Sequence, residues 1–325
     1  MIGPIPFRRL LLCLAGLFVA ALASAQEFPT KPIRIIVPYP SASGPDLVAR
    51  SLAPVMAKQL GENVIVENKG GGGGVPAILD LRNSPHDGHT LLWPDSSQWA
   101  VFPALRNDLP YDPVRDFAPI GMVYRNALYF FVKPDSPIKS MSDVIAQAKT
   151  KPGALKYGVT GVGSIMHVVG EAWRSAAGVS VTAVPYRASK ESLAGVMNGD
   201  LDYSLSGYST IKELYKAGKI RPLASTGGKR DKYSPEIPSV NEFGVNNFDF
   251  SAEIGLVGYA GTPKPVIDKL SRALLASQKD QGFNDFLKTL DYDIVSTTPE
   301  EFAAKIRNDL EKFRAVAKAA NIKVQ

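Results

Sequence analysis

Short segments rich in β-branched residues alternate with amphipathic helical segments along most of the chain. This alternation favours parallel strands joined by crossover helices. It predicts an α/β fold with doubly wound sheets, in which ligands bind beyond the carboxyl ends of the strands. Strands are expected at 33–37, 64–67, 90–93, 129–132, 156–159, 181–184, 201–205, 221–225 and 254–258. Helices are expected at 46–60, 76–81, 142–150, 164–177, 189–198, 210–217, 264–277, 281–290 and 299–320, with an irregular surface segment at 109–117.

Residues 1–25 have the pattern of a secretory signal peptide. Arg8 and Arg9 precede an apolar run, Leu10–Ala23, that is short for a membrane span. Ala23-Ser24-Ala25 has the small-x-small form of a cleavage site, so we expect cleavage after Ala25 and a mature protein in the periplasm. The single cysteine, Cys13, lies within this segment, so the mature protein is expected to have no disulfide and no cysteine metal site.

Charge gives no indication of a nucleic-acid partner. The net charge of +6 includes the two arginines of the signal segment. The remaining Lys and Arg residues are scattered, and their densest group, Lys229–Lys232, is interrupted by Asp231. We therefore expect that group to be a solvated surface loop.

The junction from Lys31 to Arg50 joins a strand to a helix through a loop of small residues. Pro38-Tyr39-Pro40 follows the strand, and Ser41-Ala42-Ser43-Gly44 leads into a helix that restarts at Pro45. Such a junction directs unpaired backbone N–H groups and the positive helix end at one point, which suits a small anion. The structural alternative is a cap and turn without a ligand.

Two further glycine- or serine-containing loops have the same position relative to a helix. Gly70–Gly74 lacks the Lys-Ser/Thr ending of a phosphate-binding loop, so it is interpreted either as a flexible turn or as a cleft loop. Thr160–Ser164 precedes a helix, with Ser164 as its N-cap and neighbouring N–H groups that suit a carboxylate. His167, one turn on, is more often a structural partner than a ligand contact in such a position.

The sequence contains no convincing catalytic or metal-binding set. Ser164 is in no G-x-S-x-G elbow, and its spacing to His167 does not build a triad. His86 and His89 flank an expected Asp-Gly turn and match no zinc signature. We therefore expect a binding protein and not an enzyme, with no catalytic residue, metal or cofactor. A serine hydrolase is the disfavoured alternative.

Eight segments in shared order resemble a known family, the Bug-type periplasmic solute-binding receptors of tripartite tricarboxylate transporters. They are KPIRIIVPYP (31–40), ENKGGGGG (67–74), DGHTLL (87–92), LPYDPVRDF (109–117), GVGSIMH (161–167), VPYRAS (184–189), AGKIRPLASTG (217–227) and AGTPKPVIDKL (260–270). The resemblance covers nearly the whole mature chain.

The resemblance implies the two-lobed fold of a type II periplasmic binding protein, with two crossing hinge strands and closure around the ligand. It places lobe 1 at 26–131 plus 254–325 and lobe 2 at 132–253. The implied partners are a small organic carboxylate and the membrane permease subunits of a tripartite tricarboxylate transporter, and the receptor is expected to be a monomer. A ligand sensor for a membrane signalling protein is the alternative that the sequence leaves open.

The family's binding loops imply a set of ligand-binding residues. They are Tyr39, Ser41, Ala42, Ser43, Gly44, Gly74, Val75, Ser97, Gly163, Ser164, His167, Ala188, Ser189 and Ser206.

The chain departs from the family's pattern at three positions. Pro45 stands where the family often has Thr, so one or two hydrogen bonds to a carboxylate are lost, and Ala188 stands where Gly is usual. Ser206 stands where members that bind amino acids tend to carry Asp, so a non-amino mono- or dicarboxylate is predicted. Trp99, Phe102 and Tyr208 offer stacking surfaces for an aromatic acid, although packing is the favoured interpretation of all three.

Overall fold

The structure is a computed structural model that describes residues 28–159, 163–186, 188–319 and 322. The predicted signal peptide and its cleavage site lie outside these residues. Within them, no helix is long and apolar enough to cross a bilayer.

Ten strands form one continuous sheet in the order β2-β1-β3-β9-β4-β7-β5-β6, with β8 and β10 both paired to β4. The pairs β1–β2, β1–β3, β5–β6 and β5–β7 are parallel, whereas every pair that includes β4 or β9 is antiparallel. The strands are β1 (Ile33–Val37), β2 (Val64–Asn68), β3 (Thr90–Leu92), β4 (Phe117–Val132), β5 (Lys156–Val159), β6 (Thr182–Pro185), β7 (Tyr203–Gly207), β8 (Arg221–Ser225), β9 (Ser251–Tyr259) and β10 (Asp293–Ile294).

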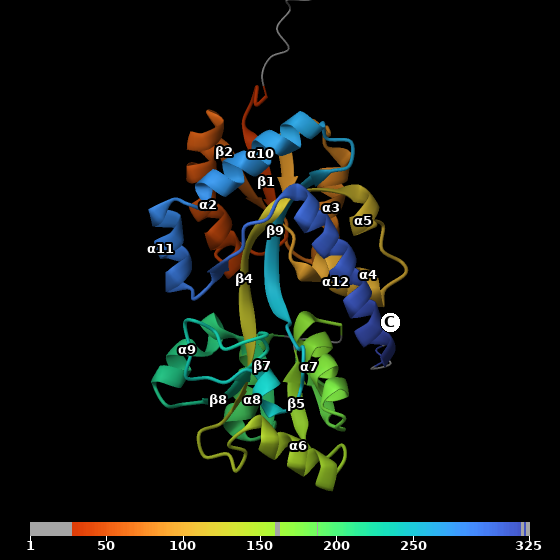
Figure 1. The fold of residues 1–325 in the computed structure, drawn as a ribbon, viewed down its shortest axis with the longest axis vertical. Coiled ribbons are helices and arrows are strands. Elements are labelled where there is room, and N and C mark those ends of the chain that lie inside the picture. The colour runs from red at the N-terminus through yellow and green to blue at the C-terminus, as the bar shows by residue number, and fades with distance from the viewer. Residues whose placement is uncertain (1–27, 160–162, 187, 320–321, 323–325) are drawn as a thin grey trace, which may run out of the picture.

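Helices cover both groups of parallel strands (Figure 1). They are α2 (Gly44–Leu60), η1 (Gly72–Gly74), α3 (Val75–Asn83), η2 (Ser97–Val101), α4 (Phe102–Leu105), α5 (Pro113–Asp116), α6 (Met141–Thr150), α7 (Ile165–Ala176), α8 (Ser189–Asn198), α9 (Tyr208–Lys216), η3 (Val240–Phe243), α10 (Lys264–Ser277), α11 (Gln281–Thr289) and α12 (Pro299–Ala319).

Two long antiparallel strands, β4 and β9, connect the two lobes (Figure 1). One end of β4 pairs with β9 from Phe117 to Ala127, and its other end pairs with β7 and β8. The upper lobe in Figure 1 contains β1–β3 with α2, α3 and α10, and the lower lobe contains β5–β8 with α6–α9. The two-lobed α/β fold with two crossing strands is thus confirmed. The lobe boundaries at 131/132 and 253/254 stay a prediction.

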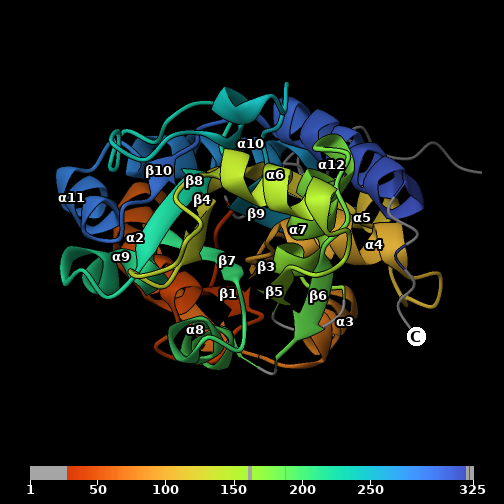
Figure 2. The same cartoon turned by 90° about the horizontal axis from the view of Figure 1, so that it is seen from below.

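Apolar packing secures each lobe and the back of the crossing strands. One cluster packs α2, α10 and α11 against β1 and includes the fully buried Ile35, Leu52 and Leu270. A second surrounds Trp173 and Phe130 in the lower lobe and extends through Phe302 and Phe313 of α12. Helix α12 therefore packs against the region where β4 and β9 connect the lobes, and Figure 2 shows it on the flank opposite α11.

The strand predicted from the sequence is shorter than β4, and no strand was predicted at β10. Residues 129–132 were predicted as a strand, but β4 begins twelve residues earlier, at Phe117. Its sequence does not alternate between polar and apolar residues because most of its side chains are buried on both faces. The expected irregular surface segment at 109–117 is also corrected. It contains the short helix α5 and a buried Tyr111, and it ends where β4 starts.

Candidate functional site

A cavity of about 410 Å³ lies between the two lobes. Loops that follow β1, β2 and β3 form one wall, and the first residues of α7, α8 and α9 form the other. The floor consists of Tyr124, Asn126 and Leu128, alternate residues of β4, with Ala252 and Ile254 of β9 beside them. The site therefore occupies the carboxyl ends of the parallel strands, as the α/β pattern predicts.

Six of the fourteen predicted site residues line this cavity: Tyr39, Gly74, Ser97, Ser164, Ser189 and Ser206. The other eight are not among its lining residues: Ser41, Ala42, Ser43, Gly44, Val75, Gly163, His167 and Ala188. A role for any of the fourteen in ligand binding stays a prediction.

The loop 41–44 is held by its own chain. Ala42 N donates to Asp46 Oδ2 at 2.8 Å, and both the N–H and the hydroxyl of Ser43 donate to the Pro40 carbonyl. Asp46 is buried and also accepts from Asn68 and Arg50. Burial raises the pKa of Asp46, but these hydrogen bonds outweigh it and leave the pKa lowered. A side-chain carboxylate thus already occupies the positive end of α2.

The glycine run forms a tight turn against η2. Gly74 has φ 85° and precedes α3, and a Cβ placed on it would lie 3.1 Å from the side chain of Gln98. Gly73 makes a similarly close approach to Phe102, which lines the cavity. These glycines are therefore required for the close approach. Gly71, Gly73 and Gly74 line the cavity and Val75 is not among its lining residues, so a binding role for this loop stays a prediction.

Three helices of the lower lobe begin at the cavity. Ser164 caps α7 by accepting from His167 N at 3.2 Å, and its hydroxyl donates to none of the described residues. Helices α8 and α9 follow Ala188 and Gly207, and in the described part of the chain neither has a side-chain cap. Their first N–H groups lack intrahelical partners, so these helix ends suit an anion in the cavity.

His167 is a structural partner of the loop before α7. Its Nδ1 accepts from Gly163 N at 3.0 Å. Burial lowers the pKa of the imidazole, which is consistent with a neutral ring that accepts at Nδ1. This contact agrees with the favoured structural interpretation of His167, and a role in ligand binding stays a prediction.

The opposite wall contains a carboxylate that the sequence analysis missed. Asp95 lines the cavity and accepts a short hydrogen bond from the Tyr39 hydroxyl, as well as one from Ser97 N at 2.8 Å. Burial raises the pKa of Asp95 despite these donors. One signal was present in the sequence, because Asp95 follows the strand at 90–92, where a parallel strand delivers its loop to the binding edge.

Acidic groups outnumber basic ones around the cavity. Among the described residues that line it are Asp95 and Glu253 but no Lys or Arg. Glu253 is paired with Lys305 of α12 at 2.7 Å, and Lys305 also contacts Asp309 at 3.1 Å. Burial raises the pKa of Glu253. Among the described residues, the donors that the wall offers to an anionic ligand are therefore N–H and hydroxyl groups.

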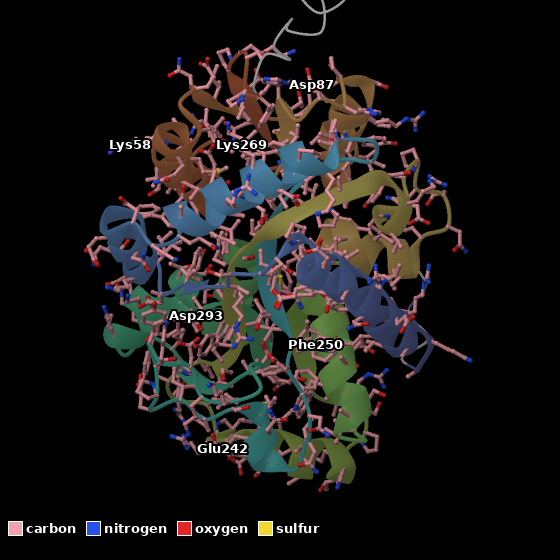
Figure 3. The ribbon with its side chains drawn as sticks, turned by 45° about the horizontal axis from the view of Figure 1, so that its top comes forward. Lys58, Asp87, Glu242, Phe250, Lys269 and Asp293 are labelled. Carbon is pink, nitrogen blue, oxygen red and sulfur yellow. The ribbon has the colours of Figure 1, made fainter. Side chains whose placement is uncertain are left out.

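The segment 291–293 connects the lobes at one side of the cavity. Tyr292 lines the cavity, stacks on Tyr124 with ring centres 4.8 Å apart, and has its hydroxyl 3.4 Å from Ser209 Oγ of α9. Its neighbours Asp291 and Asp293 form ion pairs with Lys212 and Lys232 of the lower lobe. Figure 3 shows Asp293 at the level where the lobes meet.

The remaining candidates from the sequence have structural roles. Trp99 is fully buried, with Nε1 donating to Asp309, and Tyr208 packs on Tyr129, so the packing interpretation is confirmed for both. Ser206 lines the cavity, but its Oγ is buried and has no hydrogen-bond partner among the described residues.

His86 and His89 hold nearby turns. His89 Nε2 accepts from Thr30 N, and His86 Nε2 contacts the Arg82 carbonyl. Among the described residues, no cluster of three metal-ligating side chains occurs.

Comparisons with known proteins agree with this fold. The model of a family described as "Tripartite tricarboxylate transporter family receptor" matches residues 48–322. The chain is 31% identical to a UPF0065 protein of Cupriavidus necator over 93% of this chain and 92% of the relative. It is 27% identical to BugT of Bordetella pertussis over 97% and 98%.

Similar solved structures include a periplasmic transporter, with 31% identity, a TM-score of 0.78 and coverage of 92% and 100%. The periplasmic binding protein BugD is 28% identical with a TM-score of 0.76 over 92% of this chain and 100% of BugD. A protein of R. palustris solved with adipate is 26% identical with a TM-score of 0.79 over 91% and 99%.

Proposed function

The chain belongs to the tripartite tricarboxylate transporter receptor family, and from this premise we propose that it captures a small non-amino organic carboxylate between its lobes for delivery to a membrane permease. The observation that supports this proposal most is the convergence of α7, α8 and α9 on one cavity by their N-terminal ends. Each end offers N–H donors and a positive dipole to an anion.

The chemistry of the lower wall favours a carboxylate held by neutral groups. The hydroxyls of Ser164 and Ser189 line the cavity with the helix ends, and hydrogen bonds from such donors to an ionised oxygen are stronger than those between neutral groups. The R. palustris relative was solved with adipate, which supports an organic acid as the ligand class. Position 206 is a serine, so no fixed charge is supplied there for an α-amino group.

The site also supports binding without turnover. Ser164 Oγ accepts from the backbone N–H of His167, while His167 Nδ1 accepts from Gly163. A nucleophilic serine needs a base at its hydroxyl, and His167 Nδ1 is already occupied by the loop. We therefore propose a monomeric periplasmic receptor that performs no catalysis.

A thermal-shift screen against aliphatic and aromatic carboxylates, amino acids and sugars tests the proposal. A carboxylate at about a hundred times its dissociation constant should stabilise the mature protein by about 2.7 kcal/mol, which gives a visible rise in melting temperature. A shift produced only by amino acids would refute the non-amino assignment. A shift produced only by sugars or amines would refute the carboxylate site.

A pair of capping variants separates binding from stability. Ser164→Ala and Ser140→Ala each remove an N-cap hydroxyl, at α7 and α6 respectively, and each should lower stability by about 1 kcal/mol. Only Ser164 lines the cavity. Calorimetric titration with the carboxylate found in the screen should therefore show weaker binding for Ser164→Ala and unchanged binding for Ser140→Ala. Equal affinities in both variants would contradict the proposed contact.

A further inference from the structure

The upper wall of the cavity presents acceptors where the lower wall presents donors. Tyr39 donates its only hydroxyl proton to Asp95, so the phenol oxygen has only lone pairs left to offer. Ser97 also directs its N–H and hydroxyl at Asp95. Gln98 accepts from Asp95 N at 2.7 Å and donates to the Gly73 carbonyl at 3.3 Å. The side chains of this wall are therefore hydrogen-bonded within the wall, and most of these bonds involve Asp95.

A second carboxylate on the ligand would meet this wall at a cost. It would lie against the Asp95 carboxyl and the Tyr39 oxygen, with Glu253 also on the cavity surface. No Lys or Arg side chain lines the described part of the cavity to compensate for that charge. Two carboxylates that share a site repel each other. The pKa of one of them is therefore raised, and binding the ligand with both groups ionised is disfavoured.

The register of the floor strands gives the length of ligand that reaches both walls. Asp95 bridges to Ile254, which lies opposite Tyr124, whereas Gly207 at the start of α9 lies opposite Leu128. These levels are four residues apart on β4, which is about 13 Å at about 3.3 Å per residue. Subtracting about 3 Å for a hydrogen bond at each end leaves about 7 Å. That span, between the two terminal oxygens of the ligand, suits an extended chain between butanoate and hexanoate length.

We propose that the Asp95–Tyr39 pair selects a hydroxycarboxylate, with the carboxylate at the helix ends of the lower lobe and a terminal hydroxyl donating to the pair. The inference rests on the proposed function, because it requires the carboxylate to bind at the lower wall. Asp95 and Tyr39 are thus the determinants that discriminate a hydroxy acid from a dicarboxylate of equal length.

The geometry favours a hydroxyl over an ammonium at this position. An ammonium has three N–H groups to satisfy, whereas a hydroxyl has one. The oxygens of Asp95 already accept from Tyr39, Ser97 and the N–H of Gln98. The Asp95 carboxyl attracts an ammonium, but its oxygens are already occupied, so a buried ammonium would keep N–H donors unpaired, and that cost offsets the attraction.

A matched ligand series tests the inference by isothermal titration calorimetry at pH 7.5. The series is hexanoate, ω-hydroxyhexanoate, ω-aminohexanoate and adipate, together with the corresponding butanoate-length set. At the preferred length we expect the hydroxy acid to bind at least tenfold more tightly than the dicarboxylate or the amino acid. We expect it to bind at least threefold more tightly than the plain fatty acid.

Three variants test whether the preference for the hydroxy acid depends on Asp95 and Tyr39. Asp95→Asn should reduce the ratio of adipate to hydroxyhexanoate dissociation constants at least fivefold, because the wall loses its acid. Tyr39→Phe should weaken the hydroxy acid at least threefold more than it weakens hexanoate, and it keeps the test available if Asp95→Asn does not fold. Asp285→Asn, in α11 and away from the cavity, is the matched acid-to-amide control and should change neither ratio.

The outcomes separate the inference from the function on which it rests. Adipate or ω-aminohexanoate binding as tightly as the hydroxy acid would overturn the inference alone, as would an unchanged ratio in both Asp95→Asn and Tyr39→Phe. Binding of neutral diols with no binding of any carboxylate would overturn the proposed function, and the inference with it.

Discussion

Replacing Lys305 by Met should destabilise the protein far more than a surface ion pair of the same spacing would suggest. Lys305 lies between Glu253 of β9 and Asp309, four residues on in α12. The two acids are 13% and 14% exposed, so the substitution leaves two shielded carboxylates without their cation. Removing one partner of a buried pair costs about 3–5 kcal/mol, mainly because the remaining charge is uncompensated.

Lys264→Met is the matched control. Lys264 forms the same i,i+4 contact, with Asp268 at 2.8 Å, but its side chain is 73% exposed. Solvent screens this pair, so the substitution should produce no resolvable change in stability. The assay is urea unfolding followed by tryptophan fluorescence, with the midpoint and slope compared at pH 7.5.

The penalty of Lys305→Met should also depend on pH. Burial holds the pKa of Glu253 above its ordinary value of 4.5, and loss of the cation raises it further. Between the ordinary and the raised pKa the folded variant binds a proton that the unfolded chain does not, so its stability falls as pH rises through that window. The loss should thus be largest at pH 7.5 and smaller at pH 5. A loss equal to that of Lys264→Met, or one independent of pH, would refute the reasoning.

Two further predictions concern the lower lobe. Burial lowers the pKa of His167 below its ordinary 6.5, so on acidification the unfolded state takes up a proton first, and wild-type stability should decline below about pH 6.5. His167→Gln should reduce the difference in unfolding free energy between pH 7 and pH 5, measured by urea titration. An unchanged difference would contradict this prediction. Gly170→Ala places a Cβ 2.5 Å from the buried Tyr157 ring and should cost about 1–3 kcal/mol. Gly282→Ala, exposed in the first turn of α11, is the control and should change stability by less than about 1 kcal/mol, and equal effects in thermal melts would contradict the packing argument.

The strands and helices that could be predicted are those with local signals. The capping residues Ser140 and Ser164 and the terminating Gly199 act on their own helices, so the sequence places those ends within a residue or two. The length of β4 was not predictable in this way. Its first part is recognised as a strand only when β9, more than a hundred residues later, pairs with it.

The site residues show the same difference between local signals, which the sequence reveals, and long-range contacts, which it does not. Ser164 was predicted as a cavity residue because a strand–loop–helix junction is visible in the sequence, whereas Ser189 was predicted through the resemblance to the family, and both line the cavity. The Asp95–Tyr39 pair joins residues 56 positions apart, and it forms because β1 and β3 are neighbours in the sheet. The closing of loop 41–44 by Asp46 depends on Asn68 and Arg50, which the loop sequence alone does not reveal.

A crystal structure of the mature protein with the tightest-binding carboxylate is the most direct measurement of the central claim, that helix ends of the lower lobe hold an anion in the interlobe cavity. We expect the carboxylate within hydrogen-bond distance of N–H groups at the starts of α7, α8 or α9 and of the Ser164 hydroxyl. A carboxylate bound outside the cavity, or held by lysine or arginine side chains away from these helix ends, would contradict the account.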